Sequence, residues 1–397
     1  MVGPEVGARE GGVAAGPDRR GGAGRLSAPP ALRAALLRWY RAHRRDLPWR
    51  RTRDPYAIWV SETMLQQTRV ETVVPYWERF LARFPTLQAL ADAPPDDVLG
   101  AWAGLGYYRR ARDLQRAARE VVARFGGALP ADAEALRSLP GVGRYTAGAV
   151  ASIAFDRPEP VVDGNVARVL ARLRGVRDDV TSAAGSRRLW DEAAALARGP
   201  APGDLNQALM ELGATLCAPR APRCLACPLT RFCDAFRAGD ADVLPVRGAR
   251  RAPLAVEAVA ALLVRDGRAL AVRRPAPGLF AGLWDLPGGD VARGETPAQA
   301  LARALEERTG LRPARAEPAG ALDHELTHRR LRLHLFRAAA GAGRVRRRHF
   351  DAHRWLAPEA LAALPIGALT ARALRALLPA SPGGATDARP RAAPEAL

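Results

Sequence analysis

The sequence contains no lysine: its 60 basic residues are all arginine, and with 41 acidic residues they give a net charge of +19. A chain without lysine has no side-chain amine that could form an imine with a carbonyl compound, so this kind of covalent catalysis is excluded for every side chain. The positive charge favours an acidic polymer as partner. Biased base composition also produces chains rich in Ala, Gly, Pro and Arg, so the charge alone does not identify that partner.

Cysteine is scarce and confined to one stretch. The sequence has only four cysteines, and all of them lie between Cys217 and Cys233. This excludes a disulfide framework spread over the chain. It favours a metal or iron–sulfur site instead.

Long apolar segments are also missing. The longest mostly apolar run, residues 254–264, is too short to cross a bilayer and contains Glu257. Residues 1–26 have no apolar core of signal-peptide length and are expected to be a disordered extension. We therefore expect a cytoplasmic monomer without a membrane partner.

The periodicity of the chain predicts two structured parts. Residues 27–237 repeat apolar side chains at helical spacing, whereas residues 254–379 combine strand and helix patterns. Residues 238–253 have little periodicity and are expected to be a linker, and residues 380–397 a disordered tail. The predicted fold is a multidomain one, with an all-α domain followed by an α+β domain.

Local signals refine the second part. Residues 255–274 predict two strands around an Asp-Gly turn, and residues 329–339 predict another strand. Between them we expect one amphipathic helix that is capped by Thr296, has Pro297 at its first position and ends at Gly310.

Residues 139–148, LPGVGRYTAG, indicate a helix, a tight turn and a second helix. Backbone N–H groups of Gly141, Val142 and Gly143 in such a turn can bind a phosphate. An ordinary helical turn is the alternative. Asp163 follows in PVVDGNVARVL, where it could be merely a helix cap, although Asn165 would cap as well. Together, hairpin and aspartate resemble the helix–hairpin–helix DNA glycosylase superfamily, which places this aspartate at the target sugar.

The cysteines have the spacing C-x6-C-x2-C-x5-C, and they are Cys217, Cys224, Cys227 and Cys233. Four thiolates in so short a loop suit either a [4Fe–4S] cluster or a structural zinc ion. The spacing is similar to that of the endonuclease III/MutY branch of the superfamily. That resemblance implies a [4Fe–4S] cluster that shapes a basic loop, with Arg220, Arg223 and Arg231, against DNA.

Glu62 lies in an otherwise uncharged stretch, IWVSETML. Burial there would raise its pKa and make it a proton donor at neutral pH, whereas a solvated glutamate is the alternative. Residues 54–80 resemble MutY-type adenine DNA glycosylases, in which this glutamate is the catalytic acid. Residues 102–114 resemble their strand-separating loop. The resemblance implies that Gln67, Leu105 and Tyr107 insert into duplex DNA; packing in the core is the alternative.

Adenine leaves deoxyribose readily only after ring protonation, and the resulting oxocarbenium-like sugar needs a negative partner. By chemistry and resemblance, Glu62 is the acid and then the base for water, and Asp163 is the stabiliser or nucleophile. Strand-cutting relatives carry lysine where this chain has Tyr145. We therefore expect base removal without strand cleavage, with Tyr145 and Asn165 holding Asp163 or the attacking water.

Residues 282–310 resemble the Nudix box, which they match at Gly289, Glu295, Arg303, Leu305, Glu307, Gly310 and Leu311. Ala304 and Arg308 replace glutamates at metal-ligand positions, so we expect a Nudix-like domain that binds but does not hydrolyse. In MutY proteins such a domain recognises 8-oxoguanine. HELTH at 324–328 resembles the lesion-reading loop and places Thr327 and His328 there; a surface hairpin without a role is the alternative.

These patterns predict a MutY-type adenine DNA glycosylase. Its expected partner is duplex DNA with adenine opposite 8-oxoguanine or guanine. One alternative is a related iron–sulfur mismatch glycosylase with another target base. The others are a DNA-tethered Nudix nucleotide hydrolase and a non-enzymatic DNA-binding protein.

Overall fold

The computed structural model describes residues 29–248, 252–326 and 328–378. The expected N-terminal extension, the expected tail and Thr327 lie outside these ranges. Within them, no helix combines the length and the apolar character needed to cross a membrane.

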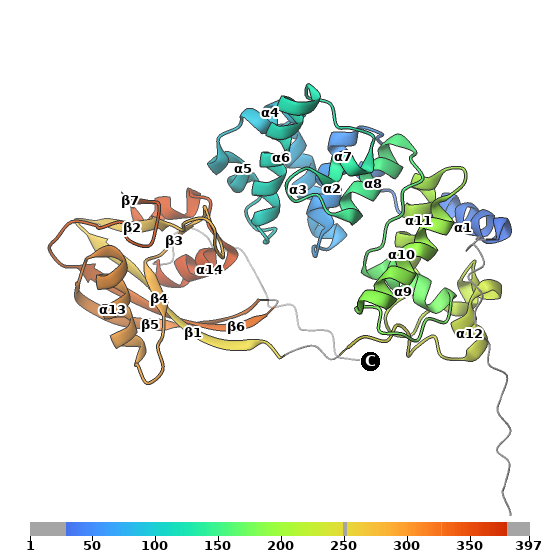
Figure 1. Cartoon of the computed structure of the whole chain (residues 1–397). Coiled ribbons are helices and arrows are strands. Elements are labelled where there is room, and N and C mark those ends of the chain that lie inside the picture. The colour runs from blue at the N-terminus through green and yellow to red at the C-terminus, as the bar shows by residue number, and fades with distance from the viewer. Residues whose placement is uncertain (1–28, 249–251, 327, 379–397) are drawn as a thin grey trace, which may run out of the picture.

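The first part of the chain is helical, as predicted (Figure 1). Its helices are α1 (Pro30–His43), α2 (Pro55–Leu65), α3 (Val70–Arg83), α4 (Leu87–Asp92), α5 (Pro95–Ala101), α6 (Arg109–Phe125), α7 (Ala133–Arg137), α8 (Arg144–Phe155), α9 (Gly164–Leu173), α10 (Ala183–Ala197), α11 (Pro202–Thr215) and α12 (Asp234–Ala238). Short 3₁₀ turns cover Pro48–Arg50, Cys224–Ala226 and Thr230–Phe232.

Helix α2 lies at the centre of this part. Its sequence, PYAIWVSETML, is apolar on every side, and the chain buries every residue from Tyr56 to Met64. Asp54 fixes where the helix begins, because its two carboxylate oxygens accept hydrogen bonds from the backbone N–H groups of Tyr56 and Ala57. Helices α2 and α8 each contribute side chains to two apolar cores, so they pack together between the two halves of the helical part.

The second part is a mixed sheet with the strand order β3-β2-β1-β6-β5, with β4 paired to β1 and β7 to β2. The strands are β1 (Leu254–Arg265), β2 (Arg268–Arg273), β3 (Trp284–Asp285), β4 (Gly288–Asp290), β5 (Pro313–Leu326), β6 (Arg329–Ala340) and β7 (Ala352–Leu356). β1 and β6 run parallel, and the other pairs run antiparallel. The hairpin predicted over residues 255–274 is confirmed by β1 and β2, and the strand predicted over residues 329–339 is confirmed by β6.

One helix covers each face of the sheet. Apolar residues alternate along β1, so Val259 and Leu263 pack with α13 (Pro297–Thr309), whereas Ala260 and Leu262 pack with α14 (Ala368–Leu377). A 3₁₀ turn, Pro358–Ala363, precedes α14. The predicted ends of α13 are confirmed: Thr296 caps it, Pro297 is its first residue and Gly310 closes it at a φ of 73°.

The two parts are in direct contact, and α14 lies on the side of the sheet toward the helices (Figure 1). Leu283, on the loop between β2 and β3, is 1% exposed and belongs to the apolar core of the helical part. Tyr108 Oη donates a hydrogen bond of 3.2 Å to the carbonyl of Ile366.

The segment expected to be a linker is partly packed on the helices. Leu244 is buried, its carbonyl accepts a hydrogen bond from Arg172, and the carbonyl of Val246 accepts one from the N–H of Val180. Low periodicity signals the lack of a helix or strand there, but it does not distinguish a packed segment from a free one.

Candidate active site

Glu62 is buried in the last turns of α2 and is only 4% exposed. Burial raises the pKa of its carboxyl group to about 7, because the apolar surroundings disfavour the charged form. The predicted raised pKa is thus supported by the structure, and the alternative of a solvated carboxylate is excluded. At neutral pH this group can both hold and release a proton.

Tyr145, at the start of α8, faces Glu62. Its hydroxyl group donates a hydrogen bond of 2.6 Å to Oε2 of Glu62 and lies 3.3 Å from the sulfur of Met210. Burial and the two nearby carboxylates, Glu62 and Asp163, raise the pKa of Tyr145 well above its usual value, so it remains a donor. The sequence predicted that this hydroxyl group would hold Asp163 or a water molecule; in the structure it bonds to Glu62 instead.

Asp163 lies where α9 begins. Its carboxylate accepts hydrogen bonds from the N–H of Val166 at 2.7 Å and from the side-chain amide of Asn165 at 3.1 Å. Burial raises its pKa, and these hydrogen bonds act in the opposite direction. Asp163 is therefore also the N-cap of α9, a role for which the sequence offered Asn165 equally; Asn165 instead orients the aspartate.

A second buried glutamate lies close by and was missed in the sequence. Glu211, on α11, accepts hydrogen bonds from Arg45 and Arg50. Although burial opposes it, these bonds lower the pKa of Glu211 to about 2. The charge of Arg50 also reaches Glu62, where it lowers the pKa slightly against burial. The sequence did contain a pattern that indicates this buried glutamate. MELGATL is an apolar helical stretch with one acid, which is the same pattern that identified Glu62.

The hairpin between α7 and α8 has the backbone that its glycines predict. Gly141 has a φ of 73°, and a Cβ atom there would lie 2.6 Å from the Cβ of Asp113. Gly143 is the N-cap of α8, and the side chain of Val142 is buried in the helical core. Val142 can thus meet a phosphate only through its backbone.

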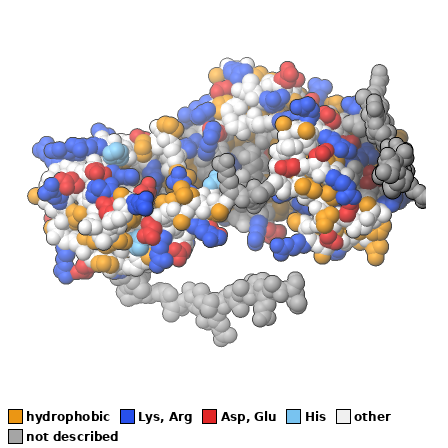
Figure 2. Space-filling view, turned by 60° about the horizontal axis from the view of Figure 1, so that its bottom comes forward, with side chains coloured by type: hydrophobic (Ala, Val, Ile, Leu, Met, Phe, Trp, Pro, Cys, Tyr) orange, Lys and Arg blue, Asp and Glu red, His pale blue; other side chains and the backbone are white. Residues whose placement is uncertain are grey.

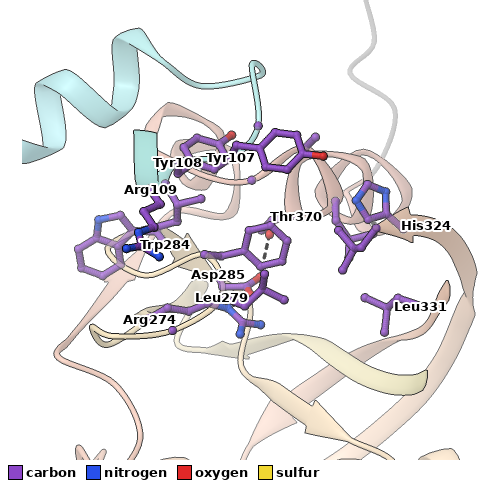
Figure 3. Close-up of a pocket in the computed structure, with 18 of the residues that line it drawn as sticks. Tyr107, Tyr108, Arg109, Arg274, Leu279, Trp284, Asp285, His324, Leu331 and Thr370 are labelled. Atoms are coloured by element: carbon purple, nitrogen blue, oxygen red, sulfur yellow. Dashed lines mark hydrogen bonds and ion pairs between the residues drawn. The ribbon is translucent and has the colours of Figure 1, made fainter. Parts of the chain in front are cut away.

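A cleft of about 1300 Å³ lies between the helices and the sheet. It brings together most of the residues predicted to contact DNA, namely Gln67, Leu105, Tyr107, Gly141, Val142 and His328. Figure 3 shows Tyr107 from the helical part and His324 from β5 at the edge of this space. Glu62, Tyr145 and Asp163 do not line the cleft, but Thr63 and Gln66, neighbours of Glu62 on the chain, do.

Among the predicted inserting residues, exposure separates Leu105 from the others. Tyr107 is 48% exposed and Gln67 is exposed, whereas Leu105 is 6% exposed and packs in the helical core. Gln67 and Tyr107 have left-handed backbones, with φ values of 58° and 48°. Such strain in non-glycine residues is typical of functional positions.

Arginines line the cleft on both sides, among them Arg109, Arg112, Arg274, Arg308 and Arg329. Figure 2 shows arginine side chains over both parts of the molecule on the face it displays, with acidic side chains between them. This distribution suits a polyanion that contacts both parts at once.

The four cysteines line one small cavity beside α9 and α11. None forms a disulfide. Arg172 donates to Sγ of Cys217 at 3.3 Å, and the N–H of Leu229 donates to Sγ of Cys227 at 3.4 Å. Within the described ranges, no three Cys, His, Asp or Glu side chains lie close enough to bind one metal ion.

The two glutamates that match the Nudix box, Glu295 just before α13 and Glu307 on it, are held in ion pairs. Arg303 donates to both oxygens of Glu295 at 2.8 Å and to Glu307 at 3.1 Å. Ala304 is fully buried, and the guanidinium of Arg308 would lie 3.4 Å from a Cβ atom at Gly289. The surroundings of the Nudix carboxylates are thus cationic, which disfavours a divalent metal ion.

Comparison with known families agrees with this two-part architecture. Residues 60–194 match the HhH-GPD superfamily of base excision DNA repair proteins, and residues 258–376 match the NUDIX domain. A solved thermostable thymine-DNA glycosylase aligns with 52% of the chain and 95% of its own length, at 32% identity and a TM-score of 0.48.

Curated relatives extend the match over most of the chain. The adenine DNA glycosylase of Mus musculus is 40% identical over 363 residues, which cover 78% of this chain and 70% of the mouse protein. The Homo sapiens adenine DNA glycosylase is 40% identical over 357 residues, covering 76% of this chain and 65% of the human protein. The chain thus spans about two thirds of the length of these relatives. It belongs to the adenine DNA glycosylase family.

Proposed function

We propose that this protein removes adenine that is mispaired with 8-oxoguanine or with guanine in duplex DNA, and that it leaves the DNA strand intact. The observation that supports this proposal is the hydrogen bond between Glu62 and Tyr145, with Asp163 near enough to raise the pKa of both groups. One carboxyl group with a pKa of about 7 and a second one that accepts two hydrogen bonds match the needs of glycosidic bond hydrolysis.

In the proposed mechanism the target adenine leaves the base stack and binds beside Glu62 on α2. Glu62 protonates the base and the N-glycosidic bond breaks, so the bonding electrons leave with adenine. Because Tyr145 donates to Oε2, Oε1 is the oxygen that delivers the proton. Asp163, oriented by Asn165 and Val166, stabilises the positive sugar or forms a transient bond to it. Glu62 then takes a proton from the attacking water.

The lack of lysine supports the second half of the proposal. Strand cleavage through an imine needs an amine at the sugar. The residue that we assign to this place is Tyr145, which carries a hydroxyl group and bonds to Glu62. No side chain elsewhere in the sequence can replace it.

The two parts of the chain have separate roles in this proposal. Residues 27–237 grip the DNA phosphates through Gly141, Val142 and Gly143 and carry the chemistry. Residues 254–379 face the opposite base, with Thr327 and His328 reading 8-oxoguanine. His328 lines the cleft from this side, which supports the assignment.

We propose that Cys217, Cys224, Cys227 and Cys233 hold a [4Fe–4S] cluster, because they surround one cavity. The cluster would supply no step of base removal; it would hold the loop that carries Arg220, Arg223 and Arg231.

Single-turnover release of adenine from duplexes with adenine opposite 8-oxoguanine, guanine or thymine tests the function. We expect release from the first two, and a loss of at least about 1000-fold in Glu62→Gln, which cannot donate the proton. Glu192→Gln is the matched control, because Glu192 is equally buried but pairs with Arg174. No release opposite 8-oxoguanine, or equal rates in wild type and Glu62→Gln, would overturn the proposal.

A further inference from the structure

Arg110 connects the two segments that carry Gln67 and Tyr107, the exposed residues that the resemblance to MutY-type glycosylases predicts to insert into DNA. It is the second residue of α6, and its guanidinium lies between the end of α2 and the loop that precedes α6. Neither the sequence motifs nor the proposed mechanism uses this side chain.

On one side, the guanidinium caps the end of α2. Nη1 donates to the carbonyls of Thr63 at 2.9 Å, Met64 at 2.8 Å and Gln66. These carbonyls belong to the last turn of α2 and the residue after it, where acceptors need outside donors and a positive charge is favourable. Thr63 directly follows Glu62, so this contact fixes the helix end that carries the catalytic acid.

On the other side, the same guanidinium holds the strand-separating loop. Nη2 donates to the carbonyls of Gly106 at 3.2 Å and Leu105 at 3.4 Å. The guanidinium carbon also lies 5.3 Å from the centre of the Tyr107 ring, a distance at which cation and ring attract each other.

The accepting carbonyls of Gln66 and Gly106 come directly before Gln67 and Tyr107 in the chain. Gln67 and Tyr107 are both exposed, and both have left-handed backbones. A non-glycine residue keeps such a conformation only when its surroundings enforce it. One side chain thus holds the residue before each of two strained positions that lie on separate elements.

We propose that Arg110 is a positioning residue that locks Gln67 and Tyr107 into one rigid pair, set in register with Glu62, so that both enter the duplex together. Burial lowers the pKa of Arg110 to about 10, and the guanidinium therefore stays charged at neutral pH. This inference rests on the proposed function for its substrate, but its geometry is independent of it.

Arg110→Met removes the hydrogen bonds and keeps the length of the side chain. We expect adenine release to slow by about 100-fold, the scale of misplacing reacting groups. Arg119→Met is the matched control, because Arg119 caps the carbonyls of Ala91 and Ala93 from the same helix without reaching the loop. Its rate should stay within about threefold of wild type. Equal rates in the two variants would overturn the proposal.

A double-mutant cycle separates positioning from a general loss of structure. If Arg110 acts through Tyr107, the double variant Arg110→Met/Tyr107→Ala will be no more than about threefold slower than the slower single variant. If the double variant instead slows adenine release by the product of the two single-variant factors, the two residues act independently and the proposal is contradicted. Should Arg110→Met fail to fold, Arg110→Gln, which retains a donor for one side only, takes its place in the cycle.

A binding measurement keeps this inference distinct from the proposed function. The fluorescent analogue 2-aminopurine replaces the target adenine opposite 8-oxoguanine, and its emission rises when the base leaves the stack. We expect a rise with wild type and Arg119→Met, and less than about a tenth of it with Arg110→Met. If wild type gives this rise without releasing adenine, the proposed function fails and the role of Arg110 stands. If Arg110→Met gives the full rise, the role of Arg110 fails.

Discussion

The hydroxyl group of Tyr145 and the carboxyl group of Glu62 are joined by a hydrogen bond of 2.6 Å, which links the hairpin helix α8 to the buried helix α2. Burial raises the pKa of Glu62 to about 7, and this hydrogen bond acts in the opposite direction. Tyr145 therefore sets how firmly the acid holds its proton, in addition to occupying the place of a lysine.

Tyr145→Phe removes that donor and should raise the pKa of Glu62 further. An acid catalyst must be protonated, so the fall in adenine release at high pH should move to higher pH. Single-turnover rates from about pH 5 to about pH 9 measure this shift. Tyr56→Phe is the control, because the buried hydroxyl of Tyr56 bonds to the carbonyl of Phe84, away from the acid. A profile of Tyr145→Phe that stays in place or moves to lower pH would contradict the assignment.

Glu62 should also make the stability of the protein depend on pH. Its folded pKa of about 7 lies above the usual 4.5, so the folded state binds the proton more tightly than the unfolded state does. This contribution is fully present below the usual pKa and is lost as the pH rises through about 7. Ionisation then costs up to about 3 kcal/mol.

Glu62→Gln does not lose this stability at high pH, because glutamine does not ionise. We expect the variant to be more stable than wild type at about pH 8 and closely matched at about pH 5, as measured by urea unfolding. Glu192→Gln, which loses an ion pair to Arg174, should instead be less stable at both values. A difference between Glu62→Gln and wild type that is the same at both pH values would show that Glu62 is not held in its neutral form.

Burial of Glu62 could be predicted from the sequence, because Glu62 is the single acid in the uncharged stretch IWVSETML; the alternative, a solvated glutamate, is wrong. The two ends of α13 could also be predicted, because the residues that set them, Thr296, Pro297 and Gly310, lie at the helix ends themselves. Helix caps can be predicted from sequence because a capping side chain bonds to backbone groups only a few residues away.

What could not be predicted depends on residues far apart in the chain. Tyr145 and Glu62 are separated by 83 positions, and only the packing of α8 on α2 decides that the hydroxyl meets Glu62 and not Asp163. Leu105 looked like an inserting residue in its motif but packs in the core, while its neighbour Tyr107 stays exposed. Leu283 lies on a loop between two strands of the sheet, but its side chain belongs to the core of the helical part.

Tyr145→Lys would place the one lysine of the chain beside Glu62 and Asp163. We expect this variant to form an imine with the sugar after base release, because the amine takes the place of the hydroxyl. Borohydride reduction would then trap a covalent DNA adduct. Wild type should give at most the trace that its terminal amine produces. A strong adduct with wild type, or none with Tyr145→Lys that still releases adenine, would contradict the proposed position of Tyr145 at the sugar.

The four cysteines should bind about four iron atoms per chain and give the protein visible absorption. Metal analysis and absorption of protein purified without oxygen measure this. Cys227→Ser should lose iron and bind duplex DNA more weakly, because the arginines of that loop lose their support. A colourless protein with one zinc ion would contradict the cluster assignment.

The most direct test of the account is strand analysis after complete reaction with a duplex that carries adenine opposite 8-oxoguanine. Half of each sample is treated with hot alkali, which breaks DNA wherever a base is missing. The account predicts an intact strand before alkali and a single break at the target adenine after it, with neither in Glu62→Gln. A break at that position without alkali, or no break after alkali, would contradict the claim that this protein removes adenine and leaves the strand whole.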